Sequence, residues 1–172
     1  GAASLATGQP SVSAANENLN VGGSTAPSSA GQTAKRIVID APLVRGSFSV
    51  RGARLDDVIL TSYKESLDED SDNIHFLQKI NSERPFFVEF GWSSSDDSQP
   101  MPTADSLWSA DRDVLTPSSP VTLTWANGQG LTFIRRISIN DNYLFTFEDS
   151  VSSTLAGDIT LYPYGLVRRH GK

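Results

Sequence analysis

Only a few side chains of this sequence could exchange protons near neutral pH. The chain holds two histidines, His75 and His170, and no cysteine. Histidine is the side chain that most readily gains and loses a proton near pH 7. In the run Ile74 to Leu77, alternation predicts that His75 points outward beside buried neighbours, and His170 lies near the end of the sequence. Both positions favour a structural role, and no catalytic residue is predicted.

Adjacent carboxylates occur twice, at Asp56-Asp57 and at Asp96-Asp97. General acid-base catalysis needs two groups that reach the same substrate atom. Neighbouring residues of a strand point to opposite faces, so neither pair is predicted to cooperate in this way. Carboxylates that are distant in the sequence could still meet in the fold.

The acidic run after Leu67 contains the spacing of a calcium loop. Asp68, Asp70 and Asp72 match the first three alternating ligands, but Asn73 stands where the turn glycine belongs and Lys79 where the bidentate glutamate belongs. We therefore predict a solvated loop and no metal site. The sequence also lacks a G-x-S-x-G elbow, a P-loop and a G-x-G-x-x-G motif, so no cofactor is predicted.

Large aromatic side chains are the remaining candidates for recognition, because a ring with one polar atom suits both cores and binding clefts. Trp125 alternates with Leu123 and is predicted to be core. Trp108 follows a long polar loop and could stand at the rim of a cleft. Trp92, Trp108 and Tyr143 are accordingly the predicted cleft or partner-binding residues.

The elements that would position these side chains begin after residue 34. Residues 1–34 are rich in Ser, Gly, Ala, Asn, Thr and Pro, with one charge and no aromatic residue, and predict a flexible tether. Residues 35–172 carry short β-branched and aromatic runs separated by Gly, Pro or Asp, and predict one folded domain.

Alternation with a period of two dominates this domain and predicts strands. Residues 121–125, 131–139 and 143–148, joined by turns at Asn127-Gly128 and residues 140–142, predict a three-stranded antiparallel meander. A last strand is expected over residues 158–162, ending at Pro163 and Gly165. Roughly nine or ten strands and little helix predict an all-β, twisted, two-sheet antiparallel sandwich.

The formal net charge of −6 argues against a nucleic-acid partner, which would require clustered Lys and Arg. No apolar run approaches the length needed to cross a bilayer, so the chain is predicted to be soluble as it stands. A membrane anchor upstream of it remains possible.

Four segments resemble the periplasmic domain of YidC-type membrane protein insertases of Gram-negative bacteria. The run from Asn127 to Tyr143 is the most specific part of the resemblance. The segments are VRGARLDDVILTSYKESLDED (50–70), FFVEFGW (86–92), LTPSSPVTLTWANGQGLTFIRRISINDNYLFTF (115–147) and LYPYGLVRR (161–169).

The resemblance implies a β-supersandwich similar to galactose mutarotase, in the periplasm and tethered to the inner membrane. It implies a non-catalytic module of an insertase and chaperone, without ATP or metal, whose partners are nascent membrane proteins and Sec translocon components such as SecDF. The family's domain also continues past the position equivalent to Arg169, so the chain is expected to be a fragment that leaves a sheet edge exposed.

Two alternatives remain open from the sequence. A carbohydrate-binding sandwich would stack Trp92, Trp108 or Tyr143 on a sugar ring. A mutarotase-like epimerase follows only from analogy of fold, which is a weak warrant.

Overall fold

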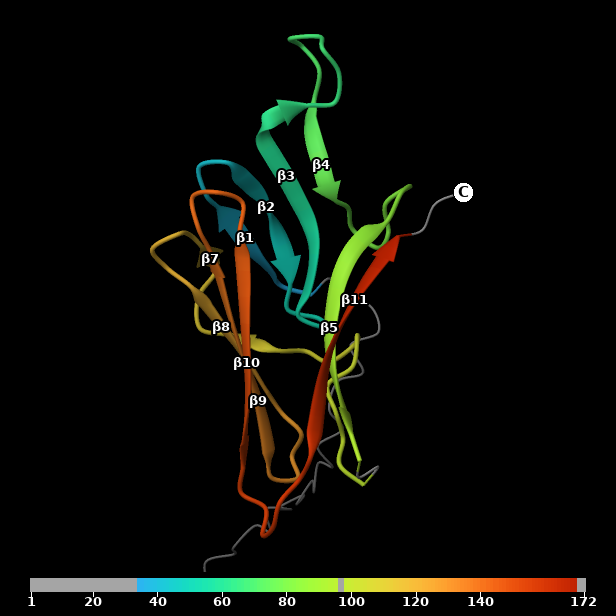
Figure 1. Ribbon diagram of the computed structural model, residues 1–172, viewed down its shortest axis with the longest axis vertical. Helices are drawn as coiled ribbons and strands as arrows, with labels where there is room; N and C mark the ends of the chain where they lie inside the picture. The colour runs from blue at the N-terminus through green and yellow to red at the C-terminus, as the bar shows by residue number, and fades with distance from the viewer. Residues whose placement is uncertain (1–33, 96–97, 170–172) are drawn as a thin grey trace, which may run out of the picture. The chain divides into compact units, whose positions relative to one another are not determined.

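The computed structural model describes residues 34–95 and 98–169 (Figure 1). Most of the tether predicted over residues 1–34 lies outside the described residues. The Asp96-Asp97 pair and His170 also lie outside them.

Every regular element within the described residues is a β-strand, which confirms the all-β prediction. No described residue belongs to a helix long and apolar enough to span a membrane. The strands are β1 (Arg36–Asp40), β2 (Val44–Ser49), β3 (Arg54–Lys64), β4 (Asn73–Leu77), β5 (Phe86–Ser94), β6 (Ser109–Ala110), β7 (Val114–Leu115), β8 (Val121–Ala126), β9 (Leu131–Ile139), β10 (Phe145–Ser153) and β11 (Leu161–Arg169).

The strands of the described residues form two sheets. The larger sheet has seven strands in the order β11-β5-β3-β2-β1-β7, with β4 paired to β3. The smaller sheet has four strands in the order β10-β9-β8-β6. Figure 1 shows β8, β9 and β10 as neighbours that follow one another along the chain. This is the antiparallel meander that the sequence predicts.

Both sheets contribute to one hydrophobic core. Phe48 of β2 and Phe133 of β9 are fully buried in it. The rings of Phe90 in β5 and Phe147 in β10 have centroids 4.4 Å apart, so side chains of the two sheets meet directly. Interdigitating inner faces are the defining feature of a sandwich, and the predicted two-sheet architecture is confirmed.

A β-bulge in β3 decides which of its side chains enter the core. Phe48 pairs with Leu55 whereas Ser47 pairs with Asp57, so Asp56 is an extra residue without a partner in β2. An extra residue shifts the alternation of a strand by one position. Leu55 and Val58 can therefore both be buried.

The prediction that the last strand ends before Pro163 and Gly165 is wrong. β11 begins at Leu161 and continues through both residues, pairing with β5 along its whole length. Proline is tolerated in an edge strand because the missing N–H can be on the side that faces away from the sheet. β11 is such an edge strand.

Candidate functional site

An apolar groove of about 450 Å³ opens between the two sheets. Most of its lining comes from the larger sheet, and Tyr143 and Phe145 contribute from the chain at the start of β10. Its lining residues are Val44, Leu55, Val58, Leu60, Tyr63, Phe76, Leu77, Val88, Tyr143 and Phe145.

Irregular pairing between β3 and β4 brings Phe76 to the groove. Val58 pairs with Leu77 and Ile59 with His75, so Phe76 is an extra residue of β4. Simple alternation predicts that Phe76 is buried beside an outward His75. Instead Phe76 is 52% exposed, and both Phe76 and Leu77 line the groove. His75 is exposed, as predicted.

Tyr143 reaches the groove from a strained backbone. Its φ angle is +69°, a left-handed value that residues with a Cβ seldom adopt. The Asn140 side chain fixes this turn, because its Oδ1 accepts hydrogen bonds from the N–H groups of Asn142 at 2.8 Å and Leu144 at 3.0 Å. The rings of Tyr143 and Tyr63 have centroids 6.1 Å apart, which joins the two sheets at the groove.

The chemistry of the groove is that of a hydrophobic contact surface. Its lining includes no charged side chain, and the only polar side-chain atoms are the hydroxyls of Tyr63 and Tyr143. Its volume falls within the range of ligand-binding pockets, roughly 300–1,000 Å³. Recognition of a sugar requires several polar groups around a stacked ring, and such groups are lacking in this lining. Apolar side chains are the ligands that fit it.

The structure separates the three residues that the sequence nominates for binding. Tyr143 lines the groove, whereas Trp92 and Trp108 do not. Trp92 packs against Phe133 of the core, with ring centroids 5.8 Å apart. Tyr63 and Phe76 are groove residues that the sequence reasoning missed. Tyr63 lies in β3 and Phe76 in the paired strand β4. That both line the groove can be recognised only when the irregular register of these two strands is known.

Trp108 is 6% exposed and lies next to a buried ion pair. Arg135 is completely buried, and its Nε and Nη2 each donate a hydrogen bond of 2.7 Å to the carboxylate of Asp149. The guanidinium carbon of Arg135 is 5.6 Å from the centre of the Trp108 ring and 4.8 Å from that of Phe90. Trp108 therefore contributes to the interior of the sandwich.

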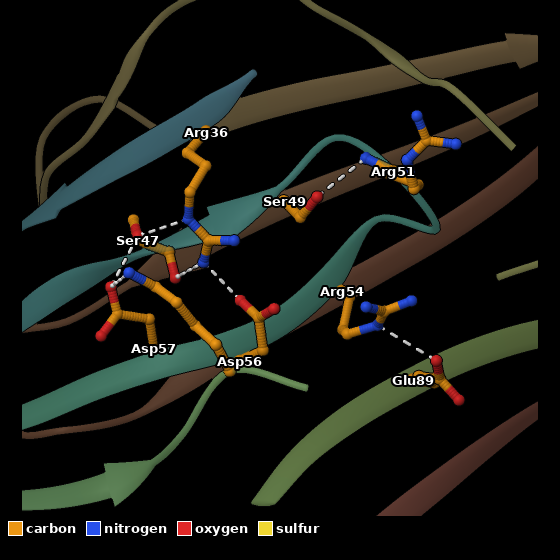
Figure 2. A network of polar contacts seen from close by, with 9 residues as sticks. Arg36, Ser47, Ser49, Arg51, Arg54, Asp56, Asp57 and Glu89 are labelled. Carbon is orange, nitrogen blue, oxygen red and sulfur yellow. Dashed lines mark hydrogen bonds and ion pairs between the residues drawn. The ribbon is translucent and has the colours of Figure 1, made fainter. Parts of the chain in front are cut away.

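Asp56 and Asp57 lie on the same face of the sheet, so the prediction of opposite faces is wrong for this pair. Arg36 forms an ion pair with Asp56, and its Nε donates to Ser47 Oγ at 2.8 Å (Figure 2). Ser47 Oγ in turn donates to Asp57 at 2.7 Å. The bulge at Asp56 causes this convergence, because it places two successive side chains outward.

Both carboxylates already have partners of their own. Asp57 also contacts the Lys79 amine at 3.4 Å, and the side chain of Asp56 is only 3% exposed. Nearby on the same sheet, Glu89 bonds to Arg54 at 3.1 Å (Figure 2) and to Arg168 at 2.9 Å. Charge pairs of this kind orient strands, and each of the three carboxylates Asp56, Asp57 and Glu89 has a basic partner.

The acidic loop carries no metal-binding arrangement. Asp68 Oδ1 accepts a hydrogen bond from the Asp70 N–H at 3.2 Å, which is a local turn contact. Within residues 34–95 and 98–169, no three His, Asp or Glu side chains are grouped closely enough to hold a metal ion.

Comparison with known proteins gives a consistent result. The profile of the YidC periplasmic domain matches residues 36–172. The membrane protein insertase YidC of Methylorubrum extorquens (strain PA1) is 46% identical over 137 residues, which cover 80% of this chain and 22% of that protein. The protein of the same name from Beijerinckia indica subsp. indica is 46% identical over 138 residues, covering 80% of this chain and 23% of its own length.

A third membrane protein insertase YidC, from Nitrobacter hamburgensis, is 40% identical over 141 residues, covering 81% of this chain and 23% of that protein. The chain thus spans less than a quarter of the length of these relatives. Both the matched profile and the identity over most of the chain establish the family. The chain belongs to the YidC periplasmic domain family.

Proposed function

We propose that this domain is a non-catalytic periplasmic module of a membrane protein insertase and chaperone, and that it contacts apolar segments of nascent membrane proteins through the groove. The observation that carries the proposal is the groove itself, with ten lining residues that include no charged side chain. The three relatives are named as insertases. Segments destined for a bilayer are rich in the apolar side chains that fit such a lining.

The aromatic residues at the groove suit transient contact. Phe76 and Tyr63 are each 52% exposed. Both rings line the same groove, and contiguous exposed apolar surface is typical of a contact site. A client segment that covers these rings gains roughly 25 cal/mol for each Å² of apolar surface removed from water. Binding on this scale is reversible, as an assisting module requires.

The test is binding of a fluorescently labelled apolar peptide to the full chain, measured by fluorescence anisotropy. Phe76→Ser is expected to weaken binding by about tenfold, because a large ring contributes more than 1 kcal/mol when buried at an interface. Val38→Ser is the matched control, since Val38 is 50% exposed on β1 and does not line the groove. Equal affinities of the two variants would refute the role of the groove.

We further propose Sec translocon components such as SecDF as partners of the parent protein. The resemblance to the insertase family supports this proposal. Pull-down with the immobilised chain from solubilised inner membranes should enrich SecDF relative to an unrelated β-sandwich domain. Equal recovery on both would contradict the proposal.

A further inference from the structure

The turn between β8 and β9 contains the one Asn-Gly pair of the sequence, Asn127-Gly128. In such a pair the backbone nitrogen of the glycine can attack the side-chain carbonyl carbon of the asparagine, which closes a succinimide ring. Two groups that are held within reach of each other react far faster than the same groups free in solution. Neither residue lines the groove, so a reaction here is separate from contact with clients.

Gly128 provides an unobstructed nucleophile. It is exposed, and a Cβ added to it would have no atom within 4 Å. No described residue accepts a hydrogen bond from its N–H. Its φ angle of +73° is a value that glycine adopts without strain, so the turn favours a residue without a Cβ at this position. Hydroxide can therefore remove the amide proton that must leave before the nitrogen attacks.

The carbonyl group under attack is held by the turn. Asn127 Oδ1 accepts hydrogen bonds from the N–H groups of Gln129 at 2.7 Å and Leu131 at 3.0 Å. Negative charge develops on this oxygen when a nucleophile adds to its carbon. Two backbone N–H groups at such distances stabilise that charge, as they do in the oxyanion holes of acyl-transfer enzymes. The turn therefore favours addition to the Asn127 side chain.

The second hairpin loop offers the same carbonyl group but a poorer nucleophile. Asn140 Oδ1 accepts hydrogen bonds from the N–H groups of Asn142 at 2.8 Å and Leu144 at 3.0 Å. The next residue is Asp141, which has a Cβ beside its nitrogen and a carboxylate that opposes removal of its amide proton. Of the two loops, only the one at Asn127 combines a well-held carbonyl group with an unobstructed nitrogen.

We propose that Asn127 is a modification site, which converts spontaneously in the folded chain to aspartate and isoaspartate. Hydroxide removes the proton of the Gly128 N–H, and this nitrogen forms a bond to Asn127 Cγ. The bond from Cγ to Nδ2 then breaks, and Nδ2 takes a proton from water and leaves as ammonia, which regenerates hydroxide. Water opens the succinimide: cleavage of the new bond gives aspartate, and cleavage of the original peptide bond gives isoaspartate. No atom is oxidised or reduced.

Conversion releases a contact between the hairpin and the segment that precedes β6. Asn127 Nδ2 donates hydrogen bonds to Gln99 Oε1 at 3.0 Å and to the carbonyl oxygen of Pro100 at 3.4 Å. Both donations are lost when an oxygen replaces Nδ2, and a carboxylate then faces two acceptors. Gln99 is half-buried, and an acceptor that loses its donor in such a place destabilises the contact. The modified chain is therefore a second, irreversible form with a weaker hold on residues 99–100.

Incubation of the full chain at mildly alkaline pH, followed by proteolysis and mass spectrometry, tests this proposal. Replacement of an amide by a carboxylate raises the mass of a peptide and so identifies each converted asparagine. Conversion at Asn127 should be faster than at Asn140 by about tenfold or more, and its rate should rise in proportion to the hydroxide concentration. Equal rates at the two asparagines would overturn the proposal.

Two substitutions exchange the nucleophiles of the loops. Gly128→Ala places a Cβ beside the attacking nitrogen and should slow conversion at Asn127 by about tenfold. Asp141→Gly removes the Cβ and the carboxylate from the second loop and should accelerate conversion at Asn140 by about tenfold. Asp141 is exposed and its φ angle is not positive, so this variant keeps its fold even where Gly128→Ala loses stability. An unchanged rate at Asn140 in Asp141→Gly would contradict the role of the following residue.

Comparison with the denatured chain measures what the fold contributes. Urea removes both hydrogen bonds to Asn127 Oδ1 and leaves the sequence unchanged. Conversion at Asn127 in the folded chain should be at least about a third as fast as in urea, because stabilisation of the developing charge offsets the restricted motion of the turn. Tryptophan fluorescence verifies that the chain stays folded without urea. A slower reaction in the folded chain would mean that the fold protects Asn127 and would refute the proposal.

Discussion

The hairpin loops at residues 127–131 and 140–144 share one hydrogen-bonding scheme but differ in their backbone at the second residue, where only Gly128 has a positive φ angle, and in the residue type at the fourth. In each loop the side chain of the first Asn accepts hydrogen bonds from the N–H groups two and four residues later. In each, the N–H of that Asn also bonds to the carbonyl four residues later, at 3.0 Å. The fourth residue has a positive φ angle in both loops, but it is Gly130 in the first and Tyr143 in the second.

Glycine is the residue that this conformation favours, because it lacks a Cβ. At Gly130, a Cβ would lie 2.9 Å from the Leu155 side chain, so any larger residue requires that side chain to shift. At Tyr143, the ring packs against the core and lines the groove. This strained conformation at a turn that glycine would form without strain is one reason why we propose a contact role for the Tyr143 side chain.

The largest loss of stability is expected when the tyrosine of the second loop is placed at the same position of the first loop. Gly130→Tyr should lower the free energy of unfolding by about 3 kcal/mol, because backbone strain adds to displacement of Leu155. Urea denaturation followed by tryptophan fluorescence measures the change. A loss below about 0.5 kcal/mol would show that the first loop accommodates a side chain as easily as the second.

Replacing the first asparagine of each loop by alanine tests whether the two asparagines contribute equally to stability. Asn140→Ala should cost about 1 kcal/mol, since two hydrogen bonds to exposed N–H groups are replaced by water. Asn127→Ala should cost about 2 kcal/mol, because Asn127 Nδ2 also donates to Gln99 at 3.0 Å. The difference between their urea midpoints is the measurement, and a larger loss at Asn140 would contradict this assignment.

The smallest expected effect on stability comes from Tyr143→Gly, which makes the second loop resemble the first. Relief of strain offsets the lost packing, so the free energy of unfolding should change by less than about 1 kcal/mol. Peptide binding to the groove should nevertheless weaken by about fivefold. A large loss of stability with unchanged binding would assign Tyr143 to the core and not to contact.

Much of the fold follows from alternation in the sequence. The meander of β8, β9 and β10 is predictable because its apolar residues keep a period of two and its turns contain asparagine. The bulge at Asp56 and the extra residue Phe76 are not predictable, because both depend on register between strands that are not yet paired. For the same reason the convergence of Asp56 and Asp57 and the position of Phe76 could not be derived.

The last strand and the buried charges could not be predicted from the sequence either. Pro163 predicts the end of a strand, and only the edge position of β11 explains why the strand continues through it. Arg135 and Arg136 read alike in the sequence, but Arg135 is buried and Arg136 is exposed. The partner Asp149 lies fourteen residues further on, opposite Arg135 in the register of β9 and β10. Tyr143, which the sequence analysis names as a contact candidate because of its aromatic ring, lines the groove.

Chemical-shift mapping of the full chain by NMR during titration with an apolar peptide shows directly whether the groove is the contact surface. Saturable shifts are expected at the groove residues Tyr63, Phe76, Val88 and Tyr143, with Val38 unaffected. Shifts that avoid the groove, or a saturable response at Trp92 and Trp108 to simple sugars in place of peptide, would contradict this expectation.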